Sequence, residues 1–394
     1  MLQHIIYGTR IISLRKAELK QKQYKLLKSL RTVTIMNPPQ DSNEYLHFRA
    51  FSHSWVAIHP QPKGIIQFVG SFFVFGSLPT IFYYFLLKSL YNQGYSIIAY
   101  PSSVIPPLRW KSKQVDHWRA AIQLLREEYA IKVELVAHIL KYSDRDYLDI
   151  YLDNSNYLWL GHSLGCKYIS LLEILSSDPP NLANNLAQCD STKKQFQIIE
   201  KYIENLESER ENSERQIDSL LTESKSGKKA VSKRFIIDQP SIFLAPEIYG
   251  TEERRGKSTS AIPFFGLFPD GKTTNCLIDL SDNFFGLTAL TAFTHDNISK
   301  DDLKALRINL SARSTVFICK SFAGYDLKLS GLSSFFSHLK PLSTSDKSLF
   351  NCIDNMFNEL RKRTTANYIP QEVQCEKSEN CSPLNLRSVN QSKA

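Results

Sequence analysis

Short apolar runs alternate with amphipathic segments along the middle of the chain, which predicts alternating strands and helices. Ile65–Val69, Tyr95–Tyr100 and Tyr157–Leu160 are almost continuously apolar, as expected for strands that are buried on both faces of a parallel sheet. Between the first two runs, the pattern predicts a helix over Thr80–Tyr91, followed by a stop at Gly94. A strand, a helix and a second strand in this order are typical of a parallel sheet.

The same pattern continues on both sides of these runs. Asp116 is a suitable N-cap for a helix over His117–Tyr129, because Trp118, Ile122 and Leu125 lie on one face of it. The remaining predicted strands are Leu46–Phe51, Trp55–His59, Ser241–Ala245, Leu287–Phe293 and Thr315–Cys319.

The stretch from Ile65 to Leu87 also allows a different interpretation. It contains 23 residues without a charge, which is long enough for a transmembrane helix. However, Gly70, Gly76 and Pro79 interrupt it and divide it into a strand, a loop and a helix. We therefore favour the parallel-sheet interpretation.

A polar, charged segment interrupts the alternation after the double proline at Pro179. Residues 181–234 are nearly free of glycine, and Phe196–Leu221 has a helical pattern. Such an insertion can serve as a lid, or it can be a solvated helical excursion without a function of its own. The predicted organisation is a basic N-terminal extension (1–44), a core domain (45–180 and 235–362), the insertion (181–234) and a disordered tail (363–394).

The first 35 residues are strongly basic, with eight lysines and arginines against the single acid Glu18. Three interpretations are open: an organellar transit peptide, a basic amphipathic segment on a membrane surface, or upstream sequence ahead of a start at Met36. The last two are favoured, since Met36 precedes a plausible flexible lead into the first strand. The segment is thus a candidate for peripheral membrane contact.

Composition narrows the class of protein. The 394 residues are 42% hydrophobic and 11% aromatic, which is ample for a large core. The net charge is +9, but no basic stripe is interleaved with stacking aromatics, so nucleic-acid binding is not predicted. The seven cysteines are scattered and never spaced as CxxC, which indicates a reducing compartment and no zinc site. No nucleotide or metalloprotease motif is present, and we expect no cofactor.

Candidate chemistry centres on the sequence Gly161-His162-Ser163-Leu164-Gly165. It follows a predicted strand and precedes a run with helical spacing, which is the context of a nucleophile elbow. In such an elbow, a serine on a tight strand-to-helix turn needs small residues two positions to either side. An ordinary glycine-bracketed turn is the alternative.

A serine nucleophile requires a general base, and in this type of sheet the order along the chain is Ser, then Asp or Glu, then His. Only His295 and His338 follow Ser163. Asp296 follows a predicted strand, and His338 is expected in a loop before the last helix, so the predicted triad is Ser163, Asp296 and His338. Asp296 as a helix cap and His338 as a surface histidine are the alternatives.

The oxyanion hole is expected to use the backbone amide of Leu164 and one from the loop after Ile65–Val69, donated by Ser71 or Phe72. Aromatic residues in and after this loop, Phe72, Phe73 and Phe75, suggest an acyl or other lipophilic substrate, although core packing would explain them equally well.

Several of these segments carry a family resemblance. Trp55–Pro60, Gly64–Phe72, Gly161–Gly165 and Ser337–Pro341 resemble domain of unknown function 1350, a family of cyanobacteria and plastids. The resemblance covers about residues 48–341 and implies an alpha/beta-hydrolase-like fold without an assigned substrate. It also implies a photosynthetic cell, with the protein in the cytoplasm or the plastid stroma. The chain departs from the family's usual pattern at Ser71, where a glycine is common, and at Lys340, where a threonine is common.

Together these features predict an α/β fold of the alpha/beta-hydrolase type, with a mostly parallel central sheet, helices on both faces and a helical insertion. The expected activity is hydrolysis of an ester or thioester through an acyl-enzyme on Ser163, with a small acyl compound as the substrate. The alternative is a non-catalytic protein of the same fold that binds a partner or a membrane surface.

Overall fold

The computed structural model describes residues 46–71, 74–101, 114–142, 145–189, 193–224, 235–248, 266–269, 271–281, 285–311, 318–324, 330–343 and 346–363. The chain divides into two units, residues 1–47 and 48–394, and the elements below belong to the second. The predictions for the basic segment before residue 45 and for the tail after residue 363 fall outside the described residues.

A mostly parallel sheet forms the centre of this unit. Within the described residues it has eight strands in the order β1-β2-β4-β3-β6-β7-β9-β10. Strand β2 is antiparallel to both β1 and β4, and all other neighbours are parallel. This strand order, with an antiparallel second strand and crossovers around β3 and β4, is the alpha/beta-hydrolase fold that the sequence predicted. The strands are β1 (Arg49–Phe51), β2 (Ser54–Ala57), β3 (Gly64–Val69), β4 (Tyr95–Tyr100), β6 (Tyr157–His162), β7 (Ser241–Leu244), β9 (Thr288–Phe293) and β10 (Cys319–Phe322), and a separate pair is formed by β5 (Gln114–Asp116) and β8 (Gly266–Phe268).

Burial on both faces explains why the central strands could be predicted. Every residue of β3, β4 and β6 is buried, as expected when helices cover both faces of a parallel sheet. The predicted run Ile65–Val69 is the centre of β3, paired with β4 on one side and β6 on the other. The transmembrane interpretation of 65–87 is therefore wrong for its first part, since these residues form a strand. None of the helices in the described ranges combines the length and apolar character that a membrane span needs.

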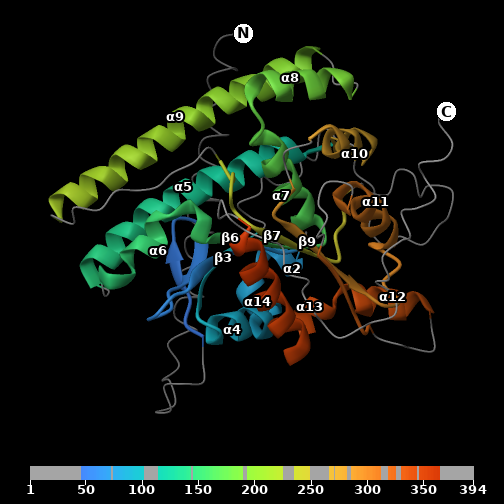
Figure 1. Cartoon of the computed structure of the whole chain (residues 1–394), viewed down its shortest axis with the longest axis horizontal. Coiled ribbons are helices and arrows are strands. Elements are labelled where there is room, and N and C mark those ends of the chain that lie inside the picture. Colours follow the sequence, from blue (N-terminus) through green and yellow to red (C-terminus); the bar gives the residue numbers. More distant parts are fainter. Residues whose placement is uncertain are drawn as a thin grey trace, which may run out of the picture. The chain divides into compact units, whose positions relative to one another are not determined.

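Helices cover both faces of the sheet (Figure 1). One side carries α5, α7, α10 and α11, and the other carries α4, α13 and α14. The helices are α2 (Val74–Ser77), α3 (Pro79–Phe82), α4 (Tyr84–Asn92), α5 (His117–Tyr142), α6 (Leu148–Leu152), α7 (Leu164–Leu175), α8 (Pro179–Gln188), α9 (Lys193–Glu223), α10 (Gly271–Leu280), α11 (Lys300–Ser311), α12 (Ser330–His338), α13 (Lys340–Ser343) and α14 (Lys347–Lys362), with short 3₁₀ turns at Arg145–Tyr147 and Asn154–Asn156.

A buried polar network joins α5 to the middle of the sheet. The side-chain amide of Gln67, on β3, donates to Gln239 (3.1 Å) and to Glu128 on α5 (3.3 Å). The side-chain carbonyl of Gln67 accepts the hydroxyl of Tyr100 at 2.6 Å. Glu128 is also paired with Lys132 at 2.6 Å. Buried polar groups are tolerated when their partners are supplied in this way, so the single polar residue of β3 fixes the position of the helix.

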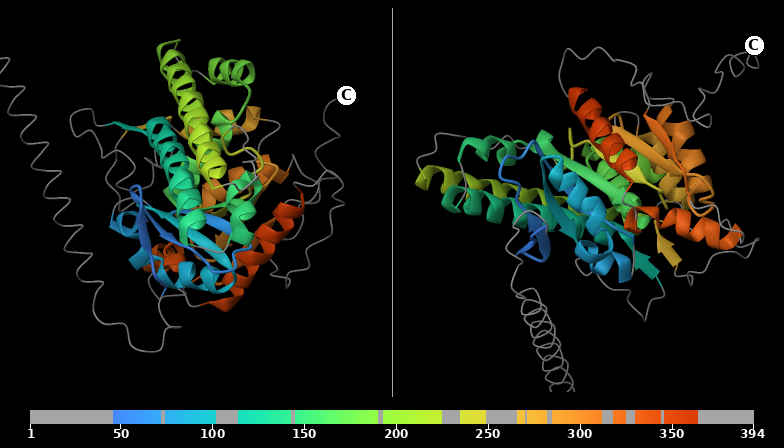
Figure 2. Two further views of the ribbon diagram at one scale, coloured as in Figure 1. Left: turned by 90° about the vertical axis from the view of Figure 1, so that its left-hand side faces the viewer. Right: turned by 90° about the horizontal axis from the view of Figure 1, so that it is seen from below.

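The insertion contributes a long helix that packs along α5 (Figure 2). Ile199, Ile203 and Leu206 of α9 belong to the same buried cluster as the helices on the sheet, and Arg126 of α5 pairs with Glu209 at 2.7 Å. The described part of the insertion is therefore held by a hydrophobic stripe, with charged residues on its outer face. Its role as a lid stays a prediction.

Several predicted element boundaries were wrong, and each has a local reason. The helix predicted over Thr80–Tyr91 is broken into α3 and α4 at Tyr83, whose side chain is fully buried. Helix α5 extends beyond Tyr129 to Tyr142, because its buried apolar residues continue as far as Ile139 and α9 packs along it. The last strand, predicted over Thr315–Cys319, continues to Phe322 in β10 (Cys319–Phe322), and residues 312–317 lie outside the described residues.

The cysteines also differ from the expectation. Cys189, at the end of α8, forms a disulfide with Cys276 on α10. The scattered cysteines were expected to indicate a reducing compartment, and this bonded pair departs from that expectation. The two residues are 87 positions apart in the sequence, so their pairing depends on the packing of α8 beside α10 and leaves no spacing signal.

Candidate functional site

Ser163 occupies the sharp turn that the elbow predicts. It lies between β6 and α7 with φ 55° and ψ −124°, a backbone conformation that is strained for any residue except glycine. Its amide donates to the carbonyl of Leu244 on the neighbouring strand β7 (3.1 Å), and its carbonyl accepts the amide of Cys166 (3.0 Å). The sheet on one side and the first turn of α7 on the other hold the strained residue in place.

Steric contacts explain both glycines of the elbow. A Cβ atom on Gly165 would lie 2.2 Å from the carbonyl oxygen of Val69, at the end of β3. A Cβ atom on Gly161 would lie 2.8 Å from the side chain of Ile169 and 3.0 Å from the amide nitrogen of Cys166. The missing side chain at Gly165 therefore lets α7 approach the backbone of β3, and the missing side chain at Gly161 lets α7 pack against its own strand β6.

The structure brings the three predicted triad residues together. Nε2 of His338 lies 2.9 Å from the Ser163 Oγ, and Nδ1 of His338 lies 3.1 Å from an Asp296 carboxylate oxygen. All three residues are buried. His338 is the last residue of α12 and not part of a loop, so its predicted local structure was wrong while its predicted position beside Ser163 matches the geometry.

Asp296 is held by a turn at the end of β9. Its carboxylate accepts the amides of Ile298 (2.9 Å) and Ser299 (3.2 Å) and the hydroxyl of Ser299 (2.5 Å). Asp296 thus fixes the turn that leads into α11 (Lys300–Ser311) and contacts His338 at the same time, while none of these bonds goes to an amide of the helix itself. Burial raises the pKa of Asp296, but the hydrogen bond and charge of His338 together with the Ser299 donors outweigh it, so the pKa is lowered. The neighbouring His295 is exposed, with a positive φ of 66°.

The charge of His338 is set by the acids around it. Burial lowers the pKa of His338, but the hydrogen bond to Asp296 and the charges of Asp296, Glu247 and Asp302 outweigh it, so its pKa lies above the ordinary value. A histidine with raised basicity that is oriented by a carboxylate is suited to accept a proton from Ser163.

A chain of hydrogen bonds runs from the loop after β3 to the backbone of His338. His162 Nε2 lies 2.9 Å from the His338 carbonyl oxygen, which can only accept, so Nε2 carries the proton. Nδ1 must then accept from the Tyr83 hydroxyl at 2.8 Å, and that hydroxyl in turn accepts the Ser71 amide at 2.9 Å. The Ser71 amide, expected in the oxyanion hole, therefore donates to Tyr83 here.

Of the other two residues expected to donate to the oxyanion, the structure describes only Leu164. Leu164 is the first residue of α7, next to Ser163, and its role as a donor stays a prediction. Phe72 lies outside the described residues. A Cβ atom on Gly70 would lie 2.9 Å from the ring of Tyr83, so the glycine at the end of β3 gives Tyr83 the room to reach the loop.

Glu247 is the site residue that sequence reasoning missed. It follows β7 at the same edge of the sheet, and a carboxylate oxygen lies 3.1 Å from the Ser163 Oγ. The signal available in the sequence was an acid just beyond a predicted buried strand, Ser241–Ala245. An acid in that place becomes informative only once β7 is known to pair with β6.

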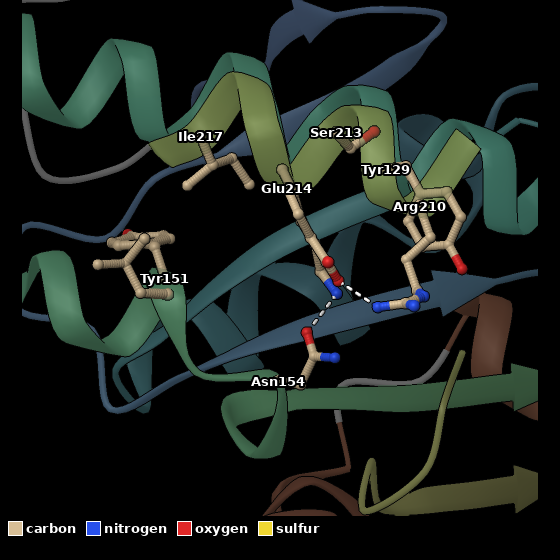
Figure 3. Close-up of a pocket in the computed structure, with 9 residues that line it drawn as sticks. Tyr129, Tyr151, Asn154, Arg210, Ser213, Glu214 and Ile217 are labelled. Carbon is tan, nitrogen blue, oxygen red and sulfur yellow. Dashed lines mark hydrogen bonds and ion pairs between the residues drawn. The ribbon is translucent and has the colours of Figure 1, made fainter. Parts of the chain in front are cut away.

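A small cavity lies away from this site, between α5, α6 and the insertion helix α9 (Figure 3). Its volume of about 30 Å³ corresponds to roughly one water molecule. Arg210 and Glu214 pair across one wall at 2.5 Å, and Lys132 donates to Asn154 at 2.8 Å on another. Its size suits packing of the insertion and not an organic substrate. Among the described residues, no group of three or more histidine, cysteine or acidic side chains is arranged to hold a metal ion.

Comparison with known proteins identifies the family. The family model "Protein of unknown function (DUF1350)" matches residues 47–244, just over half of the chain. The chain belongs to the DUF1350 family. The matched region of this DUF1350 member includes Ser163 and ends at the last residue of β7, before Glu247, Asp296 and His338. No curated protein matches the chain.

Solved structures with some likeness to this DUF1350 protein include esterases of low identity. A Lactobacillus plantarum protein assigned to the carboxylesterases is 11% identical, with 80% of this chain and 97% of that chain covered and a TM-score of 0.41. The Pyrobaculum calidifontis esterase is 10% identical (79% and 82% covered, TM-score 0.38), and carboxyl esterase 2 from Tuber melanosporum is 11% identical (78% and 82% covered, TM-score 0.37). The fold assignment above depends on the strand order itself and not on these likenesses.

Proposed function

We propose that this protein is a serine hydrolase that cleaves an ester or thioester through an acyl-enzyme on Ser163. The observation that carries the proposal is the relay of contacts from the Ser163 Oγ to His338 Nε2 (2.9 Å) and from His338 Nδ1 to Asp296 (3.1 Å). A strained serine at the start of a helix, a histidine within reach and a buried carboxylate behind it have the geometry that activates a hydroxyl.

The acylation step follows from this arrangement. The Ser163 Oγ attacks the acyl carbon while its proton passes to His338 Nε2, and Asp296 stabilises the resulting imidazolium. The negative charge on the carbonyl oxygen is met by the Leu164 amide and the N-terminal end of α7. His338 then returns the proton to the leaving alcohol or thiol as the bond to the acyl carbon breaks. In the second half, water attacks the acyl carbon and gives a proton to His338 Nε2, and His338 returns this proton to the Ser163 Oγ as the bond between Oγ and the acyl carbon breaks.

Apolar side chains beyond the oxyanion loop support a lipophilic acyl group as the substrate. Phe75 of α2 packs edge-on against Phe82 of α3, with ring centroids 5.1 Å apart. Ile81 and Phe85, on α3 and α4, are 62% and 55% exposed. These helices follow directly after β3, so they can flank an acyl chain bound at Ser163.

Covalent labelling tests the proposal directly. Incubation with a fluorophosphonate should add one probe per chain, and peptide mapping should place it on Ser163, because only an activated serine reacts appreciably. Ser163→Ala should abolish labelling while leaving thermal unfolding little changed. Folded wild-type protein that stays unlabelled across pH 5–9 would contradict the proposal and favour the non-catalytic binding protein. A series of 4-nitrophenyl esters with increasing acyl length would then test for the lipophilic substrate.

A further inference from the structure

Ser163 has a second hydrogen-bond partner that a triad does not require. The hydroxyl is 3.1 Å from a carboxylate oxygen of Glu247, in addition to the 2.9 Å contact with His338. Glu247 is also joined to the elbow through its backbone, since its amide donates to the Ser163 carbonyl at 3.2 Å. The carboxylate is therefore attached at two points to the residue whose hydroxyl it contacts.

The segment that carries Glu247 is fixed on both sides. The amide of Ala245, a residue with a positive φ of 43°, donates to the Thr291 carbonyl on β9 at 3.0 Å. The amide of Ile248 donates to the buried carboxylate of Asp302 at 2.6 Å. These anchors lie two residues before and one residue after Glu247, so the contact with Ser163 belongs to the built site and not to a side chain on a free surface loop.

Counting protons shows that the two contacts compete. The Ser163 hydroxyl has one proton, and the Glu247 carboxylate can only accept it. When the proton points to Glu247, His338 can complete its contact with Ser163 only by donating from Nε2. Because Nδ1 also donates to the Asp296 carboxylate, keeping both contacts requires the imidazolium form. When His338 is neutral and accepts the proton, the Glu247 oxygen faces the lone pairs of Ser163. The hydroxyl thus has two orientations, each matched to one charge state of His338.

The groups around His338 favour the first orientation at lower pH. Carboxylates of Asp296, Glu247 and Asp302 act on the imidazole, and all three raise its pKa against the opposing effect of burial. His162, the other titratable ring beside it, has its pKa lowered to about 3 by burial and by the charge of His338, and is neutral at ordinary pH. The charges of these three carboxylates favour the protonated form of His338, while His162 adds no competing charge. The imidazolium is therefore the stable partner for a Ser163 hydroxyl that points to Glu247.

We propose that Glu247 is a positioning residue that holds the Ser163 hydroxyl away from His338 while His338 is protonated, and releases it when His338 becomes neutral. This inference rests on the proposed hydrolase function. In the attack step, the hydroxyl turns from Glu247 to His338, the Oγ–H bond breaks, its proton goes to Nε2, and the Oγ forms the bond to the acyl carbon. Glu247 takes no proton in this sequence, but it sets the pH at which the nucleophile becomes available.

The pH profile of labelling tests this role. The rate of fluorophosphonate labelling should rise with pH through the titration of His338. In Glu247→Gln, which keeps the size and an acceptor oxygen but removes the charge, the midpoint should fall by about one pH unit. Below both midpoints this variant should react about tenfold faster than the wild type, whereas the plateau at high pH should differ by less than about threefold, since His338 is then neutral in both proteins.

Asp302→Asn is the matched control, because Asp302 also acts on His338 but does not contact Ser163, and asparagine keeps an oxygen that can accept the Ile248 amide. It should move the midpoint by less than Glu247→Gln does. An equal shift would mean that charge alone acts, and would overturn the positioning role. An unchanged midpoint in Glu247→Gln, or a plateau at least ten times lower, would overturn it as well.

Two further measurements keep the test decisive. If the glutamine variant does not fold, Glu247→Asp withdraws the carboxylate from the Ser163 Oγ and should shift the midpoint in the same direction by a smaller amount. Labelling of the wild type on Ser163 is a separate result: if it occurs while the midpoints coincide, the hydrolase proposal stands and the role of Glu247 fails. If the wild type is never labelled, the hydrolase proposal itself fails.

Discussion

His162 and His338 are buried side by side, with ring centroids 5.4 Å apart, yet their surroundings push their pKa values in opposite directions. His162, at the end of β6, contacts a phenol and a carbonyl, and burial together with the charge of His338 lowers its pKa to about 3. At the end of α12, His338 contacts a carboxylate and a serine hydroxyl, and its pKa is raised despite burial.

This difference shows that burial alone does not decide the charge of a histidine; its partners do. The carbonyl of His338 fixes the tautomer of His162, and burial and the charge of His338 keep that ring neutral. Asp296, in contrast, supplies the charge that makes a proton on His338 favourable. One ring therefore acts as a structural link and the other as a candidate base. The two are also connected, because His162 donates to the backbone of His338.

Removing the acid should have the largest effect on this comparison. In Asp296→Asn, His338 loses the carboxylate that raises its pKa and fixes its tautomer, and its environment becomes more like that of His162. We expect fluorophosphonate labelling of Ser163 to slow by about a thousandfold to ten-thousandfold. Stopped samples analysed by intact mass would give the rate.

Asp301→Asn is a suitable control for that loss. Asp301 is an exposed acid in the first turn of α11, close in sequence to Asp296 but outside the relay to Ser163. Its labelling rate should match the wild type. A slow Asp296→Asn variant that has also lost its thermal unfolding transition would indicate a structural collapse at the start of α11, where Asp296 accepts three hydrogen bonds, and not a catalytic effect.

His162 should reveal itself through the pH dependence of stability. Its pKa is about 3 in the folded protein and about 6.5 in an unfolded chain, so between these values the unfolded state binds a proton that the folded state does not. The free energy of unfolding of the wild type should therefore fall as the pH is lowered from about 6.5, by up to about 1.4 kcal/mol per pH unit from this residue.

His162→Gln removes that contribution and keeps a donor for the His338 carbonyl. Urea unfolding between pH 7 and pH 4 should show a slope that is lower by up to one proton in the variant. His117, whose pKa is lowered by burial and by Lys167, contributes equally to both proteins. The loss of hydrogen bonds at position 162 lowers stability at every pH, so parallel curves would show that His162 does not titrate as its surroundings imply.

Local pattern was sufficient for the parts of the fold that are buried on both faces. The predicted strand Tyr95–Tyr100 coincides with β4, and Ile65–Val69 differs from β3 by one residue, because a continuously apolar run has few other solutions. The elbow was predictable for the same reason: its two glycines reflect contacts within a few residues and with the adjacent strand.

Features that depend on distant partners could not be predicted in this way. The break between α3 and α4 occurs at Tyr83, whose hydroxyl bonds to Ser71 and His162. The disulfide of Cys189 and Glu247's contact with Ser163 likewise join positions at least 84 residues apart. His162 stood inside the elbow sequence, but nothing in that sequence identifies its partners.

Tyr83 offers the finest test of the link through His162. In Tyr83→Phe the ring still fills the space against Gly70 and Phe68, but the Ser71 amide and His162 Nδ1 lose their common partner. Groups left unsatisfied in this way cost about 1–3 kcal/mol of stability, and urea unfolding at pH 7 would measure the loss.

Tyr168→Phe is the matched control. Tyr168 is equally buried, and its hydroxyl has no hydrogen-bond partner in the described part of the chain, so removing this hydroxyl should leave stability unchanged or slightly raised. Equal stability of the two variants would mean that Tyr83 fills space without bonding, and that the loop after β3 is not coupled to His338 through His162.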